Sequence, residues 1–115
     1  MLRILLVEDE ALIAIMASMS LEDVGFHVTV ASDGQQGLEI ALQDRPDVII
    51  TDFMMPKMTG LEMIAKLRQS GFLAPIILAT AIQEKMLPTQ EGYDLYIPKP
   101  YLEEQLIEAV SRFVR

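Results

Sequence analysis

The feature of this sequence that most constrains its fold is a series of short, continuous apolar runs that alternate with longer segments of helical periodicity. ILLV at residues 4–7, VII at 48–50 and IIL at 76–78 contain no polar residue. Strands covered by helices on both faces need such runs, whereas a strand with one face in water alternates apolar and polar residues. The runs therefore predict a parallel sheet buried between two layers of helices.

These runs define five expected strands, separated by segments in which apolar residues recur every three or four positions. The expected strands are Leu2 to Val7, His27 to Ala31, Asp47 to Thr51, Pro75 to Ala79 and Asp94 to Ile97. The expected helices are Glu10 to Val24, Gly34 to Gln43, Gly60 to Ser70 and Tyr101 to Val114. Strands and helices in this order predict an α/β fold, a three-layer α/β/α sandwich with a parallel five-stranded sheet.

The ends of the expected helices carry start and stop signals. Thr59 and Glu62 have the spacing of a capping box, and Asp33 is a candidate N-cap. Gly25 and Gly71 stand where a glycine commonly closes a helix. These signals support the predicted helix boundaries independently of the apolar pattern.

Residues 82–93 differ from the other connections between strands. Pro88 lies in the middle of this segment, Gly92 follows it, and the apolar residues form no helical stripe. A proline inside a helix removes a hydrogen bond and clashes with the preceding turn. We therefore predict a short, irregular or mobile segment here.

Composition limits the class of protein. The 115 residues are 51% hydrophobic and contain no cysteine, so we expect one domain, residues 1–115, without disulfides. A net charge of −8 opposes direct binding to nucleic acid. The longest apolar stretch, Leu12 to Leu21, is too short to cross a membrane. The acidic residues at positions 8–10 interrupt the apolar start of the chain before the hydrophobic region of a signal peptide could form. We expect a cytoplasmic protein that is a monomer or weak dimer.

Polar residues follow four of the five expected strands. Glu8 and Asp9 follow the first, Asp52 the third, Thr80 the fourth, and Lys99 comes just after the fifth. Because ligands of open parallel sheets bind beyond the carboxyl ends of the strands, these side chains are expected to converge at one edge. The sequence thus predicts a functional site at this edge.

Three neighbouring carboxylates repel one another unless a cation or water compensates for their charge. Ligands that are all oxygen favour a hard ion such as Mg²⁺. Asp52 follows a central strand and is the best candidate nucleophile, since carboxylates form aspartyl phosphates, while Glu8 and Asp9 would hold the metal. The Lys99 ammonium and the Thr80 hydroxyl suit the oxygens of an incoming phosphoryl group.

Four strings, VEDE, TDFMMPKMTG, ILATA and YIPKP, resemble the receiver domains of bacterial two-component response regulators, in the same order along the whole chain. The resemblance implies a flavodoxin-like sheet in the order 2-1-3-4-5. It also implies that a histidine kinase or histidine phosphotransfer protein phosphorylates Asp52, and that the backbone carbonyl of Met54 completes the Mg²⁺ site of Glu8, Asp9 and Asp52. Such a phosphorelay domain is not an enzyme beyond its own phosphotransfer and slow autodephosphorylation.

The resemblance further implies a switch and a cis peptide bond between Lys99 and Pro100. Thr80 would hydrogen-bond the phosphoryl group, and Tyr96 would fill the space that Thr80 vacates, which changes a partner-binding surface. Thr80 and Lys99 are 19 positions apart, about three fewer than is usual in the family. The family's fourth helix, between the fourth and fifth strands, is therefore expected to be short or irregular.

Other functions compete with this interpretation. A pseudo-receiver, which keeps the fold without being phosphorylated, stays open as the main alternative. A Mg²⁺-dependent phosphohydrolase of the haloacid dehalogenase type would need an acid where Met54 stands. A flavin binder would place its phosphate against Glu8, Asp9 and Glu10, which repel it.

The methionines and the single histidine receive more ordinary interpretations. Helical spacing predicts that three methionines pack in the core, namely Met16, Met19 and Met63. Three methionines flank Asp52 and could either contact a kinase or pack, namely Met54, Met55 and Met58. His27, at the start of a strand, is expected to be structural.

Overall fold

The computed structural model describes residues 2–114 and contains one parallel sheet of five strands. The strands are β1 (Arg3–Val7), β2 (His27–Ala31), β3 (Val48–Thr51), β4 (Ile76–Thr80) and β5 (Leu95–Pro98). Their order in the sheet is β2-β1-β3-β4-β5, and every neighbouring pair is parallel. The predicted strands and the strand order that the resemblance implies are therefore confirmed.

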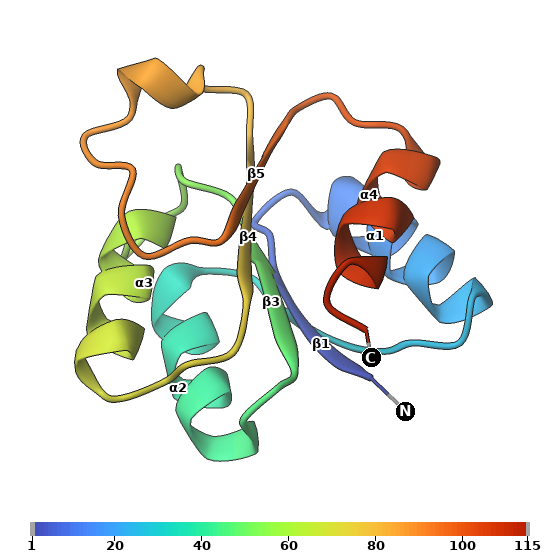
Figure 1. Ribbon diagram of the computed structural model, residues 1–115, viewed down its shortest axis with the longest axis horizontal. Helices are drawn as coiled ribbons and strands as arrows, with labels where there is room; N and C mark the ends of the chain where they lie inside the picture. The colour runs from blue at the N-terminus through green and yellow to red at the C-terminus, as the bar shows by residue number, and fades with distance from the viewer. Residues whose placement is uncertain (1, 115) are drawn as a thin grey trace.

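Helices cover both faces of this sheet (Figure 1). Helices α1 (Ala11–Asp23) and α4 (Glu103–Ser111) lie on one face, and α2 (Gly34–Asp44) and α3 (Gly60–Gln69) lie on the other. The prediction of three layers is confirmed. No helix within residues 2–114 has the length and apolar character needed to cross a membrane.

Two apolar cores, one on each side of the sheet, hold the layers together. Along β1, Leu5 and Val7 belong to the core under α2 and α3, whereas Ile4 and Leu6 belong to the core under α1 and α4. All five residues of β4 are buried. Successive side chains of a strand point to opposite faces, so a continuous apolar run supplies both cores at once.

The predicted capping and stop signals are present, although α4 is two residues shorter at its start and three shorter at its end than the predicted range of Tyr101 to Val114. The Asp33 carboxylate accepts a hydrogen bond of 2.8 Å from the backbone nitrogen of Gln36 at the start of α2. Thr59 and Glu62 form a reciprocal capping box at the start of α3. Gly25 and Gly71 follow α1 and α3 with φ angles of 101° and 84°, a region that favours glycine.

The segment of residues 82–93 contains a single 3₁₀ turn, η1 (Glu84–Met86), in place of a full helix. This confirms that the family's fourth helix is shortened. The segment is nevertheless fastened at several points: Leu87 is buried, and the Tyr93 hydroxyl donates a hydrogen bond of 2.6 Å to the Glu84 carboxylate.

Arg68 of α3 fixes the end of the same segment and was not singled out in the sequence. Its guanidinium donates hydrogen bonds of 2.8–2.9 Å to the carbonyl oxygens of Phe72, Ala74 and Gly92 and to the carboxylate of Asp94. One side chain thus joins α3, the loop before β4 and the loop before β5.

The prediction that Met16 and Met19 pack in the core is wrong, because their side chains are 61% and 58% exposed. Helix α1 is apolar on two faces, so spacing alone does not identify the inward one; Ala14, Ala17 and Leu21 take that place. Met63 is fully buried, as predicted.

The three methionines near Asp52 were expected either to pack or to contact a kinase, and they differ in burial. Met55 and Met58 are 8% exposed and belong to the core, whereas Met54 is 59% exposed. Of the three, only Met54 is exposed, so only Met54 is accessible to a partner.

Candidate functional site

The register of the sheet brings the predicted site residues together. Val7, the last residue of β1, pairs with Thr51, the last residue of β3, so the following Glu8 and Asp52 emerge side by side. On the other side of β3, the Lys99 backbone nitrogen donates to the Thr80 carbonyl oxygen at 2.9 Å. Four strands thus deliver polar groups to the carboxyl edge of the sheet, as predicted.

Lys99 lies between the two carboxylates and contacts both. Its Nζ is 2.5 Å from Glu8 Oε1 and 2.7 Å from Asp52 Oδ2. The exposed fractions of these side chains are only 11% for Lys99, 3% for Glu8 and 12% for Asp52. The ammonium therefore supplies the positive charge that two shielded carboxylates require.

The pKa values of this cluster reflect burial and mutual contact. Burial is the largest influence on Glu8 and raises its pKa, while the hydrogen bond from Lys99 opposes that rise without cancelling it. For Lys99, burial alone would lower the pKa, but the hydrogen bonds to Asp52 and Glu8 outweigh it and raise the pKa above its usual value. Lys99 thus carries its charge at neutral pH.

Backbone amides hold the remaining oxygens of the two carboxylates. The Phe53 nitrogen donates to Asp52 Oδ1 at 2.6 Å, and the Glu10 nitrogen donates to Glu8 Oε2 at 3.1 Å. The Thr51 hydroxyl donates to the Asp52 carbonyl oxygen at 2.9 Å. The bond from Phe53 orients the Asp52 carboxylate, and the bond from Thr51 holds the Asp52 backbone. Sequence reasoning did not identify the amide contacts, because backbone donors leave no residue signal.

The predicted metal ligands Asp9 and Met54 lie at the exposed rim of the site. Within residues 2–114, no three His, Cys, Asp or Glu side chains are grouped closely enough to hold a metal ion. Lys99 occupies one oxygen each of Glu8 and Asp52. The available donors are nevertheless all oxygen atoms, which is the chemistry that Mg²⁺ prefers.

Thr80 and Tyr96 are connected through the backbone of one residue, Ile82. Thr80 is buried, and its hydroxyl accepts a long hydrogen bond of 3.4 Å from the Ile82 nitrogen. The half-buried Tyr96 donates from its hydroxyl to the Ile82 carbonyl oxygen at 2.5 Å. The peptide bond between Lys99 and Pro100 is cis, as the resemblance implies.

Two further residues near the cluster were missed in the sequence. Tyr101 is half-buried, and burial is the main reason that its pKa is raised. Gly60 is the first residue of α3, and a Cβ atom there would collide with the Asp52 carbonyl oxygen. A glycine directly after a capping threonine is the signal that could have identified this close contact.

An apolar groove opens beside Lys99, between α1 and α4. Its volume is about 430 Å³, and Ile13, Met16, Pro100 and Tyr101 contribute to its walls. Glu10 and Glu103 also line it. The groove therefore combines apolar walls with acidic residues next to the candidate acceptor.

The outward face of α1 continues this apolar surface. Four exposed residues occur at the i, i+3, i+4 and i+7 positions of one helix face: Leu12, Ile15, Met16 and Met19. We call these four residues the α1 strip. A helix with apolar residues on both faces usually has a partner on each.

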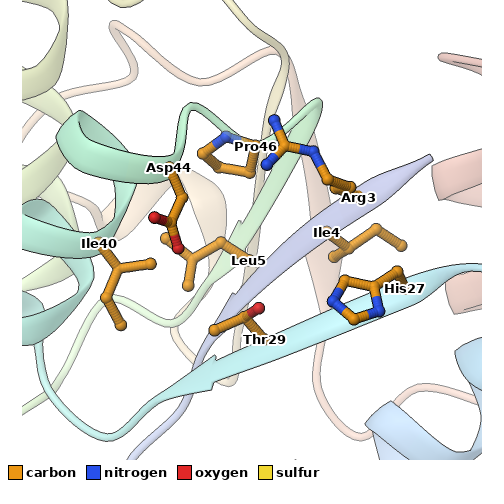
Figure 2. Close-up of a pocket in the computed structure, with 8 residues that line it drawn as sticks. All are labelled: Arg3, Ile4, Leu5, His27, Thr29, Ile40, Asp44 and Pro46. Atoms are coloured by element: carbon orange, nitrogen blue, oxygen red, sulfur yellow. The ribbon is translucent and has the colours of Figure 1, made fainter. Parts of the chain in front are cut away.

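Figure 2 shows a different pocket, at the amino edge of the sheet. It has a volume of about 90 Å³ and lies near the starts of β1 and β2, where Arg3 and His27 are located, and near the end of α2 at Asp44. The residues that line it do not include Glu8, Asp52 or Lys99. The structural interpretation of His27 stays a prediction.

A five-stranded parallel sheet in this order, with two acids and a lysine joined at its carboxyl edge, defines a receiver domain. The family model for the response regulator receiver domain matches residues 4–111. The chain belongs to the family of response regulator receiver domains.

The relatives agree with this assignment. Response regulator MprA of Mycobacterium leprae is 36% identical over 99% of this chain. The probable transcriptional regulatory protein TcrX of Mycobacterium tuberculosis is 34% identical over 97% of this chain. The match spans 51% and 49% of these two proteins, so the chain has about half the length of the curated relatives it matches.

Solved structures show the same fold. The response regulator TrrA from Thermotoga maritima, determined in complex with Mg²⁺ and beryllofluoride, has a TM-score of 0.91 and 30% identity, covering 99% of this chain and 100% of that one. The chemotaxis response regulator CheY4 of Vibrio cholerae has a TM-score of 0.88 and 32% identity, covering 99% of both chains. Receiver domains of this family bind Mg²⁺ and accept phosphoryl groups from histidine kinases.

Proposed function

We propose that Asp52 is the phosphoryl acceptor of this domain. The observation that carries the proposal is the joining of Glu8 and Asp52 through Lys99 at the carboxyl edge of the sheet. Among residues 2–114, Asp52 is the acid at that edge that lies at the end of a central strand, with one carboxylate oxygen bound by Lys99 and the other by the Phe53 amide. A carboxylate held in this way presents one defined orientation to an incoming phosphoryl group.

The surrounding residues would divide the remaining tasks. Glu8, Asp9, Asp52 and the Met54 carbonyl oxygen would hold Mg²⁺, which when bound neutralises the negative charge of the phosphoryl oxygens. Lys99 would exchange its contact with Asp52 for a contact with the phosphoryl group. The Thr80 hydroxyl would donate a hydrogen bond to the same group.

The reaction transfers a phosphoryl group from a phosphohistidine side chain to Asp52. A carboxylate oxygen of Asp52 forms a bond to phosphorus while the bond from phosphorus to the histidine nitrogen breaks. The electron pair of the broken bond returns to the imidazole, which takes up a proton. The domain catalyses this step and the slow hydrolysis of its own acyl phosphate, and it has no other enzymatic activity in this proposal.

The donor would dock on the α1 strip and the neighbouring groove. This surface is apolar, exposed and directly beside Lys99, which suits a partner that must bring its histidine to Asp52. The acidic residues at its rim, Glu10 and Glu103, favour a partner with basic residues around an apolar helix face. A second copy of this chain is less suited as the docking partner, because its net charge of −8 is repelled by the acidic rim of the groove.

The proposed response follows the link between Thr80 and Tyr96. Movement of Thr80 toward a phosphoryl group would loosen its contact with the Ile82 nitrogen, and Tyr96 could then turn inward. The surface of β5 and of residues 82–93 would change for a downstream protein partner. Since histidine kinases use ATP, the proposal also places the reaction in the cytoplasm, without direct contact of this domain to nucleic acid or membrane.

The test is incubation with acetyl phosphate and Mg²⁺, with mass spectrometry to follow phosphoryl incorporation. We expect one phosphoryl group on the wild-type protein, none on Asp52→Asn, and none when the divalent ion is chelated. Beryllofluoride should shift the backbone NMR signals of Thr80 and Tyr96. A folded wild-type protein that shows neither modification nor shifts would support the pseudo-receiver instead.

The docking surface is tested separately with Ile15→Glu. This change places a charge on the α1 strip but leaves the acid cluster intact. Uptake from acetyl phosphate should be unchanged, whereas uptake from a purified, phosphorylated histidine phosphotransfer protein should fall at least roughly tenfold. Glu39→Lys, an exposed change on α2, serves as the control for altered surface charge.

A further inference from the structure

Gly34 is the first residue of α2 and lies against the loop that follows Asp52. It is buried, and a Cβ atom at this position would collide with the Met58 carbonyl oxygen and come within 2.9 Å of the Met58 carbonyl carbon. The rotation of a side chain cannot relieve this contact, because these atoms belong to the backbone. The φ angle of Gly34 is not in the left-handed region, so the close approach, and not backbone freedom, requires the glycine.

Two glycines therefore contact the loop of residues 52–59, one near each end of the loop. Gly60 lies against the Asp52 carbonyl oxygen, and its nitrogen donates to the Phe53 carbonyl oxygen at 2.8 Å. Gly34 supports the other part of the loop, through Met58. Between these two contacts lie the Phe53 amide, which orients Asp52, and the Met54 carbonyl oxygen.

Other contacts make the start of α2 a stable support. Asp33 caps the helix by accepting from the Gln36 nitrogen, and its second carboxylate oxygen is 3.7 Å from Lys57 Nζ in the same loop. The Met58 side chain is 8% exposed and belongs to the core under α2 and α3. The loop cannot move away from α2 without disturbing that core.

We propose that Gly34 is a positioning residue for phosphoryl uptake by Asp52, an inference that rests on the proposed function of Asp52. The contact between Gly34 and Met58 sets the distance of the loop from the sheet, and with it the position of Phe53 and Met54 relative to Asp52. A shift of roughly 1 Å in reacting groups can cost about 100-fold in rate. Gly34 would act only through the loop, without touching the phosphoryl group.

The experiment compares Gly34→Ala with Gly37→Ala. Gly37 is also buried in α2, but the atoms nearest to a Cβ atom there belong to side chains outside the loop, at 2.8 Å for Val7 Cγ2 and 2.9 Å for Met63 Sδ. Both substitutions gain the helix propensity of alanine. For each variant we would measure the stability in urea, the rate of uptake from acetyl phosphate, the Mg²⁺ dependence of that rate, and the amide NMR signals of Phe53 and Gly60 without donor or metal.

We expect Gly34→Ala to shift both amide signals, to raise the Mg²⁺ concentration needed for half-maximal rate and to slow uptake at least roughly tenfold while the protein is still folded. Gly37→Ala should change the stability only. A wild-type rate with unshifted signals in Gly34→Ala, or an equal loss of rate in Gly37→Ala, would overturn the proposal.

A second variant decides the question if Gly34→Ala does not fold. Asp33→Ala removes the cap of α2 and the contact with Lys57 without adding bulk, so it should loosen the support and slow uptake several-fold. An unchanged rate and unshifted Phe53 and Gly60 signals in this variant would also contradict the proposal. If the wild-type protein itself takes up no phosphoryl group, the proposed function fails, while the amide signals still report whether Gly34 positions the loop.

Discussion

Replacement of Lys99 by methionine tests the energetics of the site most directly. Methionine keeps most of the length and apolar stem of the side chain but removes the ammonium that contacts Glu8 and Asp52 at 2.5 and 2.7 Å. With an effective dielectric constant of about 20, each contact corresponds to an attraction of roughly 6 kcal/mol. The cost of removing the three groups from water offsets most of this attraction.

The expected loss in the free energy of unfolding near neutral pH is about 3 kcal/mol. Removal of one partner of a buried ion pair typically costs roughly 3–5 kcal/mol, and the lower end applies because the site lies at the edge of the sheet, where water can reach Asp52. Lys57→Met is the matched control: Lys57 is 71% exposed and 3.7 Å from Asp33 Oδ2, so its loss should stay below about 0.5 kcal/mol.

Urea denaturation at several pH values, with and without Mg²⁺, is the assay. Burial already raises the Glu8 pKa, and without Lys99 only the hydrogen bond from the Glu10 backbone nitrogen opposes that rise, so Glu8 takes up a proton in the folded state as the pH falls. The difference between Lys99→Met and the wild type should therefore shrink at mildly acidic pH. Mg²⁺ should stabilise the variant more than the wild type, because it no longer competes with the ammonium.

The reasoning would be refuted by a Lys99→Met protein that matches the wild-type stability near neutral pH. It would also be refuted by a loss of stability that stays constant down to mildly acidic pH, since an uncompensated carboxylate must respond to protonation.

Three further predictions concern the rest of the molecule. Arg68→Met should lower the free energy of unfolding by about 2 kcal/mol in urea denaturation, because three carbonyl oxygens and Asp94 lose a shared donor; an unchanged midpoint would contradict this. Thr59→Ala should cost about 1 kcal/mol through loss of the capping box, and Thr59→Ser should restore most of it. The Tyr93 hydroxyl bound to Glu84 should lose its proton at higher pH than an ordinary tyrosine, since burial raises its pKa from 10.0 to about 12. The stability that this hydroxyl contributes is therefore fully present below pH 10.0 and is lost as the pH rises to about 12. Tyr93→Phe should remove one late-titrating tyrosine from an ultraviolet titration and leave that of Tyr101, whose pKa burial also raises. A late phase of unchanged amplitude would argue against the bond.

The fold could be predicted from the sequence to a large extent. The apolar runs of β1, β3 and β4 are continuous because both faces of these strands are buried, and this requirement is visible without coordinates. Several helix boundaries could also be predicted from the sequence, because caps and terminal glycines act on residues close to them in the chain. Such signals are Asp33, Thr59, Gly25 and Gly71. Interactions between residues that are close in the chain can be predicted from a short stretch of sequence.

The exposed face of α1 shows where the prediction failed. Met16 and Met19 have the same helical spacing as core residues, but the inward face of α1 is made by small residues, Ala14 and Ala17, which let the helix lie close to the sheet. Which of two apolar faces turns inward depends on the shape of the surface it packs against. That surface is assembled from segments distant in the sequence.

The candidate site divides in the same way. The types of its residues, their places after the strands and the order in which they occur were all determined by the sequence, because a strand end is a local feature. That Lys99 lies between Glu8 and Asp52, that Arg68 fastens the end of a shortened segment, and that Gly34 supports the acceptor loop were decided only by the tertiary structure. Each of these contacts joins residues far apart in the chain, and its distance and burial arise only when the sheet register and the packing of the helices are fixed.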